Sequence, residues 1–239
     1  VRDIIQLNTH LSKKNQESLN KKTGPHLFWR GIKIKQLPES FGDLIIEGDL
    51  YLGDDRYDSQ YKLTSLPDSF GNLTVGGNLY LDSNRLASLP ENFGNLTVGG
   101  NLYLNDNRLT SLPDSFSSLK VGGNLDLGDN RLTLPDSFGS LEVGGNLSLY
   151  SNELTSLPDN FGELKVGKGL YLDNNQLASL PKSFGKLKVG GDLSLNRNLL
   201  TSLPESFGNL TVGRDLDLSE NNLKSLPKSF GSLSVGGNL

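Results

Sequence analysis

Apolar residues return at fixed places along most of this chain. The stretch from Val75 to Thr97, VGGNLYLDSNRLASLPENFGNLT, recurs with small changes almost to the last residue, and a diverged first copy begins at Ile46. A fixed period of this length predicts a solenoid, in which each copy forms one coil that stacks on the next. Later copies start 23 residues apart, with one step of 22, at Val98, Val121, Val143, Val166, Val189 and Val212, and a last fragment starts at Val235.

Each copy contains a segment in which polar and apolar residues alternate, such as Asn78 to Asp82. The alternation predicts a short strand with Leu79 and Leu81 facing the core and Tyr80 facing outward. Because the copies share one register, the central outward position forms a row along the stack. This row reads Tyr51, Tyr80, Tyr103, Asp126, Ser148, Tyr171, Ser194 and Asp217.

Two other positions of the repeat predict internal support. An Asn follows each strand from Asn84 onward, and its amide can both donate to and accept from the backbone of a buried turn. Stacked Asn residues are therefore expected to satisfy the turn of each coil, at Asn84, Asn107, Asn130, Asn152, Asn175, Asn198 and Asn221. Nine of the ten Phe residues share one position, which predicts an apolar spine and not a binding site: Phe41, Phe70, Phe93, Phe116, Phe138, Phe161, Phe184, Phe207 and Phe230.

A pair of glycines precedes each strand. Glu47 replaces the first glycine in one copy, whereas Lys168 and Arg214 replace the second glycine in two others. We therefore expect glycine to be favoured at both positions but required at neither. Pro90 and its equivalents lack an N–H and have a fixed φ, which favours an irregular outer side over another central strand.

The motif L-x-L-x-x-N-x-L-x-x-L-P resembles the signature of the leucine-rich-repeat family. One copy shows it as Leu79, Leu81, Asn84, Leu86, Leu89 and Pro90. The resemblance covers residues 37–239. The repeats look like the bacterial Leu-Pro type, and they are more loosely similar to the repeats of secreted effectors. It implies an α/β fold, a right-handed horseshoe with a parallel sheet on the concave face and 3₁₀ turns or extended coil on the convex side. Gly76 stands where the family's first Leu is usual, so the start of the strand is expected to differ.

The first 36 residues differ from the repeats. Apolar residues among positions 1–24 fall near helical spacing, which predicts an amphipathic helix. A solenoid exposes an apolar end that needs a cover, so a cap is the favoured role and a separate binding helix is the alternative. The predicted domains are a helical cap and junction over residues 1–36 and a repeat domain over residues 37–239, with eight full repeats and a partial one.

Two copies break the period. The copy near Leu132 reads NRLTLPDSF and is one residue short, which predicts a tightened coil without chemistry. The first copy carries an insertion within residues 53–62 that includes Tyr57 and Tyr61. Asp54, Asp55 and Asp58 in this insertion could gather a hard cation, but their spacing matches no standard calcium loop. A solvated loop or a partner contact is therefore the favoured interpretation, and no metal or cofactor is predicted.

Composition narrows the classes of function. The net charge is −4, so nucleic acid is not an expected partner. The chain has no cysteine, which excludes disulfides and thiolate chemistry, and it has no apolar run long enough for a membrane span. The two histidines, His10 and His26, lie outside the repeats, so no catalytic arrangement follows the predicted fold. The chain begins without Met and ends within a repeat, which suggests a fragment of a secreted or cytoplasmic protein.

The most distinctive outward residues gather at the N-terminal end of the predicted sheet. Tyr and Arg are common at interface hot spots, and this end carries several of both. The predicted partner-binding residues are Tyr51, Tyr80, Asp82, Arg85, Tyr103, Asp106, Arg108 and Arg131, with Tyr57 and Tyr61 of the insertion. Ordinary solvated surface is the alternative interpretation of these residues.

The predicted function is a non-catalytic, monomeric protein–protein interaction module. One alternative is the substrate-recognition domain of a larger effector or ubiquitin ligase, because some effectors with similar repeats carry such a catalytic domain. Another alternative is a structural or adhesive protein that associates with itself through its last coil.

Overall fold

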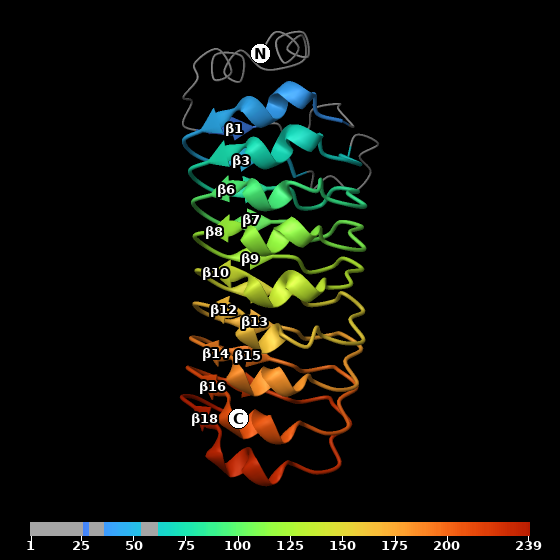
Figure 1. Ribbon diagram of the computed structural model, residues 1–239, viewed down its shortest axis with the longest axis vertical. Coiled ribbons are helices and arrows are strands. Elements are labelled where there is room, and N and C mark those ends of the chain that lie inside the picture. The colour runs from blue at the N-terminus through green and yellow to red at the C-terminus, as the bar shows by residue number, and fades with distance from the viewer. Residues whose placement is uncertain (1–25, 29–35, 54–61) are drawn as a thin grey trace.

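The computed structural model describes residues 26–28, 36–53 and 62–239. These residues form a single stack of coils, and each coil contributes two short strands and a 3₁₀ helix (Figure 1). The predicted helical cap and the insertion residues 54–61 lie outside the described residues, as does most of the predicted junction. The boundary between cap and repeat domain therefore stays a prediction.

One long parallel sheet, sheet A, runs the length of the stack. Each of its nine strands pairs with the strand one coil away, which confirms the parallel repeat architecture. Its first strand falls within the predicted junction and pairs with the second. The strands are β1 (Leu27–Phe28), β3 (Leu50–Tyr51), β5 (Leu79–Tyr80), β7 (Leu102–Tyr103), β9 (Leu125–Asp126), β11 (Leu147–Ser148), β13 (Leu170–Tyr171), β15 (Leu193–Ser194) and β17 (Leu216–Asp217).

A second parallel sheet, sheet B, precedes the glycine pairs and was not foreseen from the sequence. Val75 faces the core and Thr74 faces outward, and the glycine pair then connects this strand to sheet A. The glycine pair or its substituted equivalent follows each of these two-residue strands directly, so no alternating segment surrounds them as it does for the strands of sheet A. The strands are β2 (Ile45–Ile46), β4 (Thr74–Val75), β6 (Thr97–Val98), β8 (Lys120–Val121), β10 (Glu142–Val143), β12 (Lys165–Val166), β14 (Lys188–Val189), β16 (Thr211–Val212) and β18 (Ser234–Val235).

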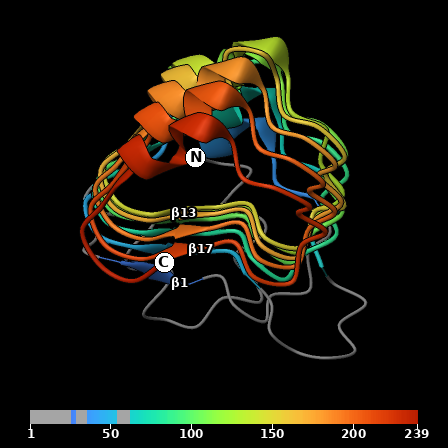
Figure 2. The ribbon, with the colours of Figure 1, turned by 90° about the horizontal axis from the view of Figure 1, so that it is seen from below.

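Short 3₁₀ helices form the side of the coil opposite sheet A (Figure 2). A proline precedes most of them, and the Phe N–H donates to its carbonyl, as Phe70 does to Pro67 at 3.0 Å. These helices agree with the convex side that the family resemblance implies. They are η2 (Glu39–Asp43), η3 (Asp68–Asn72), η4 (Phe93–Asn95), η5 (Asp114–Ser118), η6 (Asp136–Ser140), η7 (Phe161–Glu163), η8 (Lys182–Lys186), η9 (Glu205–Asn209) and η10 (Lys228–Ser232).

The predicted Phe spine and Asn ladder are both confirmed. Phe161 is fully buried and stacks on Phe184 with ring centroids 6.0 Å apart and ring planes 3° apart. Asn152 is 1% exposed, and its amide nitrogen donates to Leu127 O at 2.9 Å and Leu149 O at 3.1 Å. The side chain of one Asn thus satisfies backbone groups of two successive coils.

The expectation that glycine is dispensable before the strand is wrong for the first glycine of the pair. A Cβ added at Gly76 would lie 2.3 Å from Glu47 O, and one at Gly144 would lie 2.4 Å from Gly122 O. These contacts are with backbone of the preceding coil, which cannot move aside. Glu47 escapes this restriction because it follows β2, which is the edge strand of sheet B within the described part of the chain.

The packing of the shortened copy and of the coil before it differs from that of the other coils. Leu134 is only half-buried, whereas the equivalent Leu89 and Leu157 are 6% and 7% exposed. Ser117, in the coil before, stands where other copies have the glycine after Phe. A Cβ added at one such glycine, Gly94, would lie 1.7 Å from the next coil's carbonyl, so Ser117 needs a wider approach between its own coil and the short one. Among the described rings, Phe116 and Phe138 are the only neighbouring spine pair without stacking.

Candidate partner-binding face

Sheet A brings three tyrosines into one stack on its outward side. Tyr51, Tyr80 and Tyr103 occupy equivalent positions of β3, β5 and β7, which pair in register. The ring centroids of the first two lie 4.4 Å apart with planes 7° apart, and those of the next two lie 4.9 Å apart with planes 14° apart. We call these three residues the tyrosine stack. The sequence predicted this row, and the structure shows that its rings are in contact.

Hydrogen bonds hold the two ends of the tyrosine stack. The hydroxyl of Tyr51 donates to Asp49 Oδ2 at 3.3 Å, and the amide of Asn101 donates to the hydroxyl of Tyr103 at 3.0 Å. Burial, and then the hydrogen bond to Tyr51, raises the pKa of Tyr80. Burial also raises the pKa of Tyr103. The phenols of Tyr80 and Tyr103 are therefore neutral at physiological pH, and the three rings are arranged before any partner arrives.

The outward position before each tyrosine has an internal role that the sequence did not reveal. The side chain of Asn78 accepts a hydrogen bond from the backbone N–H of Asn101 at 2.8 Å, and Asn101 accepts one from Asn124 at 2.7 Å. Asp49 does the same for Asn78 at 2.6 Å. This second ladder connects successive coils, so its residues are part of the support for the face. The Asn or Asp at this position was the available signal.

The predicted arginines lie in a separate row, beyond the turn that ends each strand. The side chains of Arg85, Arg108 and Arg131 are exposed, whereas their backbone N–H groups donate to backbone carbonyls of the preceding coil. Within the described part of the chain these three guanidinium groups form no ion pair. The residue two places before each arginine, such as Ser83 with φ 56°, takes the left-handed conformation that turns the chain away from the sheet.

The two predicted aspartates occupy different places. Asp82 follows β5 and lies against Gly53, where a Cβ would be 2.7 Å from its Oδ1. Asp106 is exposed and sits at the left-handed turn position, with φ 52°. Tyr57 and Tyr61 lie outside the described residues. The structure thus joins the tyrosines into one stack and places the arginines past the turn.

One further tyrosine, Tyr150, lies outside the central row in the middle of the same face and was not singled out from the sequence. Tyr150 packs over Gly128, where an added Cβ would lie 2.3 Å from its ring. Asp126 accepts a hydrogen bond from the Gly128 N–H at 3.0 Å. Burial, with the nearby charges of Asp126 and Asp129, raises the pKa of Tyr150. Burial also raises the pKa of Asp126.

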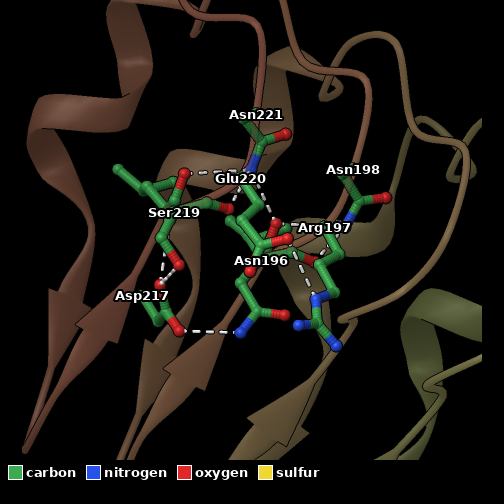
Figure 3. A network of polar contacts seen from close by, with 9 residues as sticks. Asn196, Arg197, Asn198, Asp217, Ser219, Glu220 and Asn221 are labelled. Carbon is green, nitrogen blue, oxygen red and sulfur yellow. Dashed lines mark hydrogen bonds and ion pairs between the residues drawn. The ribbon is translucent and has the colours of Figure 1, made fainter.

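The C-terminal end of the face carries a network of polar groups that bind one another (Figure 3). The Asn196 amide donates to Asp217 Oδ2 at 2.8 Å, and the Ser219 N–H donates to Asp217 Oδ1 at 2.9 Å. Arg197 forms an ion pair with Glu220 at 3.1 Å. Burial alone would raise the pKa of Asp217, but the hydrogen bonds from Ser219 and Asn196 outweigh it and lower the pKa.

Other kinds of site find little support in the part of the chain that is described. Its His, Asp and Glu side chains form no group of three or more that could hold a metal ion. Among the same residues, no helix has the length and apolar character needed to cross a membrane.

The geometry defines a class of protein: a parallel β-solenoid with an Asn ladder and an outward face made of stacked rows. The sequence profile described as Leucine Rich Repeat matches residues 101–119 and 214–233, which are in register with the other copies. The chain has the leucine-rich-repeat fold, and two of its copies match the profile of that family. Domains of this family are commonly protein–protein interaction modules.

Solved structures show the same architecture, whereas no curated protein sequence matches the chain. A chain from the Toll–Spatzle complex of Drosophila is 25% identical with a TM-score of 0.50, and the match covers 79% of this chain and 29% of that chain. This chain therefore spans less than a third of that relative. A leucine-rich-repeat protein of Leptospira interrogans is 21% identical over 95% of this chain and 94% of that one, with a TM-score of 0.31. YopM from Yersinia enterocolitica is 22% identical, with a TM-score of 0.47, and the match covers 90% of this chain and 46% of that chain.

Proposed function

We propose that this chain is a non-catalytic binding module that recognises a protein partner through the N-terminal half of sheet A. The observation that carries the proposal is the tyrosine stack. Tyr51, Tyr80 and Tyr103 cover one another's ring faces, so their edges and hydroxyl ends are what the outward side of the sheet offers to a partner.

The arrangement of these rings favours binding on energetic grounds. Ordering free side chains at an interface costs about 0.5–1.5 kcal/mol each, and stacked rings are already ordered. Tyrosine offers a large contact area with a polar end, which makes it frequent at interface hot spots. The guanidinium groups of Arg85 and Arg108 are exposed and form no ion pair with any described residue, so they add charge that a partner can neutralise. The similar Drosophila structure is a complex of Toll with Spatzle, which supports a role of this architecture in protein binding.

The opposite end of the face is the internal comparison. There the carboxylate of Asp217 accepts hydrogen bonds from the side chains of Asn196 and Ser219, and Arg197 forms an ion pair with Glu220. A partner would have to break these contacts before forming its own. The N-terminal end is therefore the better site on the same sheet.

Affinity capture followed by mass spectrometry tests this location. The baits are the unaltered chain, a variant with Tyr80→Ala, Tyr103→Ala and Arg108→Ala, and a matched control with Tyr171→Ala, Ser194→Ala and Arg197→Ala. We expect the unaltered chain and the control to capture the same proteins and the first variant to lose them. Circular dichroism and urea midpoints establish that both variants fold. Capture of the same proteins by the first variant would refute the location.

A further inference from the structure

A groove lies on the flank of the solenoid, on sheet B and away from the tyrosine stack. It has a volume of about 810 Å³ and extends over five successive coils, from β6 to β14. Its charged lining comes from the outward positions of β8, β10, β12 and β14 and from the ends of η7 and η8. The accessible lining of the groove is mostly apolar, and the largely buried valines of sheet B, such as Val121 and Val143, are among the lining residues. We call it the lysine groove; its charged residues are Lys120, Glu142, Glu163, Lys165, Lys186 and Lys188.

The charges of the lysine groove are arranged unevenly. Glu142 pairs with Lys165, and Glu163 pairs with Lys186 at 3.5 Å, so the middle of the groove is neutral. Lys120 and Lys188 are its outermost charged residues and form no ion pair within the described part of the chain. The groove therefore has four cations and two anions, a net charge of +2, on a chain whose net charge is −4.

The charged outward positions of sheet B are confined to four neighbouring coils of the groove. The outward position of sheet B holds a neutral residue in every other described coil: Ile45, Thr74, Thr97, Thr211 and Ser234. Only the four middle coils carry Lys or Glu there. The variation between copies is thus concentrated on a second surface, which is the pattern expected where repeats of a solenoid differ because of what they bind.

The spacing of the two unpaired lysines indicates the shape of the ligand. Lys120 and Lys188 are three strands apart in sheet B. Neighbouring strands lie about 4.8 Å apart, so the two positions are separated by roughly 14 Å. An extended peptide advances about 3.3 Å per residue, so side chains four residues apart point the same way with a separation of about 13 Å. We propose that the lysine groove binds an extended peptide with two carboxylates four residues apart and an apolar residue between them.

A nucleic acid strand fits this groove less well than a peptide does. Its evenly spaced phosphates would meet Glu142 and Glu163 in the middle of the groove. Proteins that bind single strands also supply aromatic rings on which bases stack. The described residues that line the groove include no aromatic side chain. A peptide whose charges lie only at its ends avoids the two glutamates.

Fluorescence anisotropy of the full chain tests the proposal. The probe is a fluorescein-labelled, end-blocked pentapeptide of sequence Glu-Ser-Val-Ser-Glu, and its counterpart has Gln at both ends. We expect saturable binding of the first peptide and at least roughly tenfold weaker binding of the second, because each end contributes one charge-assisted contact. Binding should weaken further as salt is added.

Two double variants separate the groove from general charge. Lys120→Glu with Lys188→Glu removes both end contacts, whereas Lys182→Glu with Lys228→Glu makes the same change of net charge at exposed sites outside the groove. We expect the first variant to lose at least roughly tenfold in affinity and the second to keep it. Absence of saturable binding, equal loss in both variants, or tighter binding of a single-stranded oligonucleotide than of the peptide would overturn the proposal. None of these outcomes bears on the tyrosine stack, which lies on the other sheet.

Discussion

The ring of Tyr51 lies against the ring of Tyr80, with centroids 4.4 Å apart and planes 7° apart. The two residues are 29 positions apart in the chain, and the insertion of the first copy lies between them. Parallel pairing of β3 with β5 nevertheless places them side by side. Stacking of the coils thus places a residue that recurs in successive copies in a continuous row. The buried Phe and Asn residues form rows inside the molecule for the same reason.

Removing one ring from the Phe spine should be costly. Phe161 is fully buried between Phe138 and Phe184, so Phe161→Ala leaves a cavity that the rigid coils cannot close. We expect a loss of about 3–5 kcal/mol in the free energy of unfolding by urea. Phe230→Ala, in the half-buried last position of the spine, is the control and should cost clearly less. Equal losses would show that the spine position itself contributes little.

The Asn ladder can be tested at its most buried member. Asn152→Ala removes the donor to Leu127 O and Leu149 O and the acceptor for the Leu132 N–H. These groups are shielded from water, so we expect a loss of at least about 2 kcal/mol in unfolding free energy. Asn221 makes equivalent contacts but is only half-buried, so water can replace its amide, and Asn221→Ala should cost less. A neutral Asn152→Ala would argue against the ladder as a source of stability.

Two glycines after Phe provide a matched pair. A Cβ at Gly208 would lie 2.1 Å from Ser229 O, whereas nothing lies within 4 Å of a Cβ at Gly231. Gly208→Ala should therefore cost about 1–3 kcal/mol or more, because the blocking atom belongs to backbone. Gly231→Ala should be neutral or slightly stabilising, since it reduces the freedom of the unfolded chain. Thermal and urea unfolding of both variants measure the difference, and similar losses would contradict the contact with the next coil.

Asp126 and Asp217 occupy the same row but should respond to pH in opposite ways. Burial raises the pKa of Asp126, so its ionisation opposes folding, and this penalty grows as pH rises from 3.8 through the raised pKa. Asp126→Asn should therefore gain stability relative to the unaltered chain as pH increases toward neutrality. Hydrogen bonds lower the pKa of Asp217, so its charge stabilises the fold above 3.8, and this contribution is lost as pH falls through the lowered pKa.

The matched variant Asp217→Asn should thus be destabilised near neutral pH, with the difference shrinking in acid. Urea midpoints of both variants and the unaltered chain across this pH range make the comparison. Parallel pH profiles for the two variants would show that their different surroundings do not control their ionisation.

The shortened copy and Ser117 should be energetically coupled. Inserting Ser between Thr133 and Leu134 restores the regular repeat length, but it should bring the carbonyl of the next coil onto the Cβ of Ser117. We therefore expect the insertion alone to be neutral or destabilising and Ser117→Gly to rescue it. A double-mutant cycle measures the coupling, which is about 0.5–3 kcal/mol for residues in contact. Additive effects would mean that the short coil does not accommodate Ser117.

Much of the architecture was predictable because each copy of the repeat contains the same sequence pattern. Leu79 and Leu81 alternate with polar residues, Asn84 follows the strand, and Phe93 recurs in register, so the strands, the Asn ladder and the spine were all found from the period. The row of tyrosines followed from the same register. What the sequence did not reveal is Tyr150 over Gly128, because these two residues belong to different copies and show no common pattern.

The sequence by itself determined the solenoid, its repeat unit and the order of residues in each row, since a local pattern repeated in register needs only stacking to become a structure. Only the tertiary structure decided which contacts form between neighbouring coils. The second sheet, the ladder through Asn78, the strict need for Gly76 and the lysine groove all arise from contacts between residues about 23 positions apart. Such contacts depend on how closely the coils approach, and no pattern within a single copy records that distance.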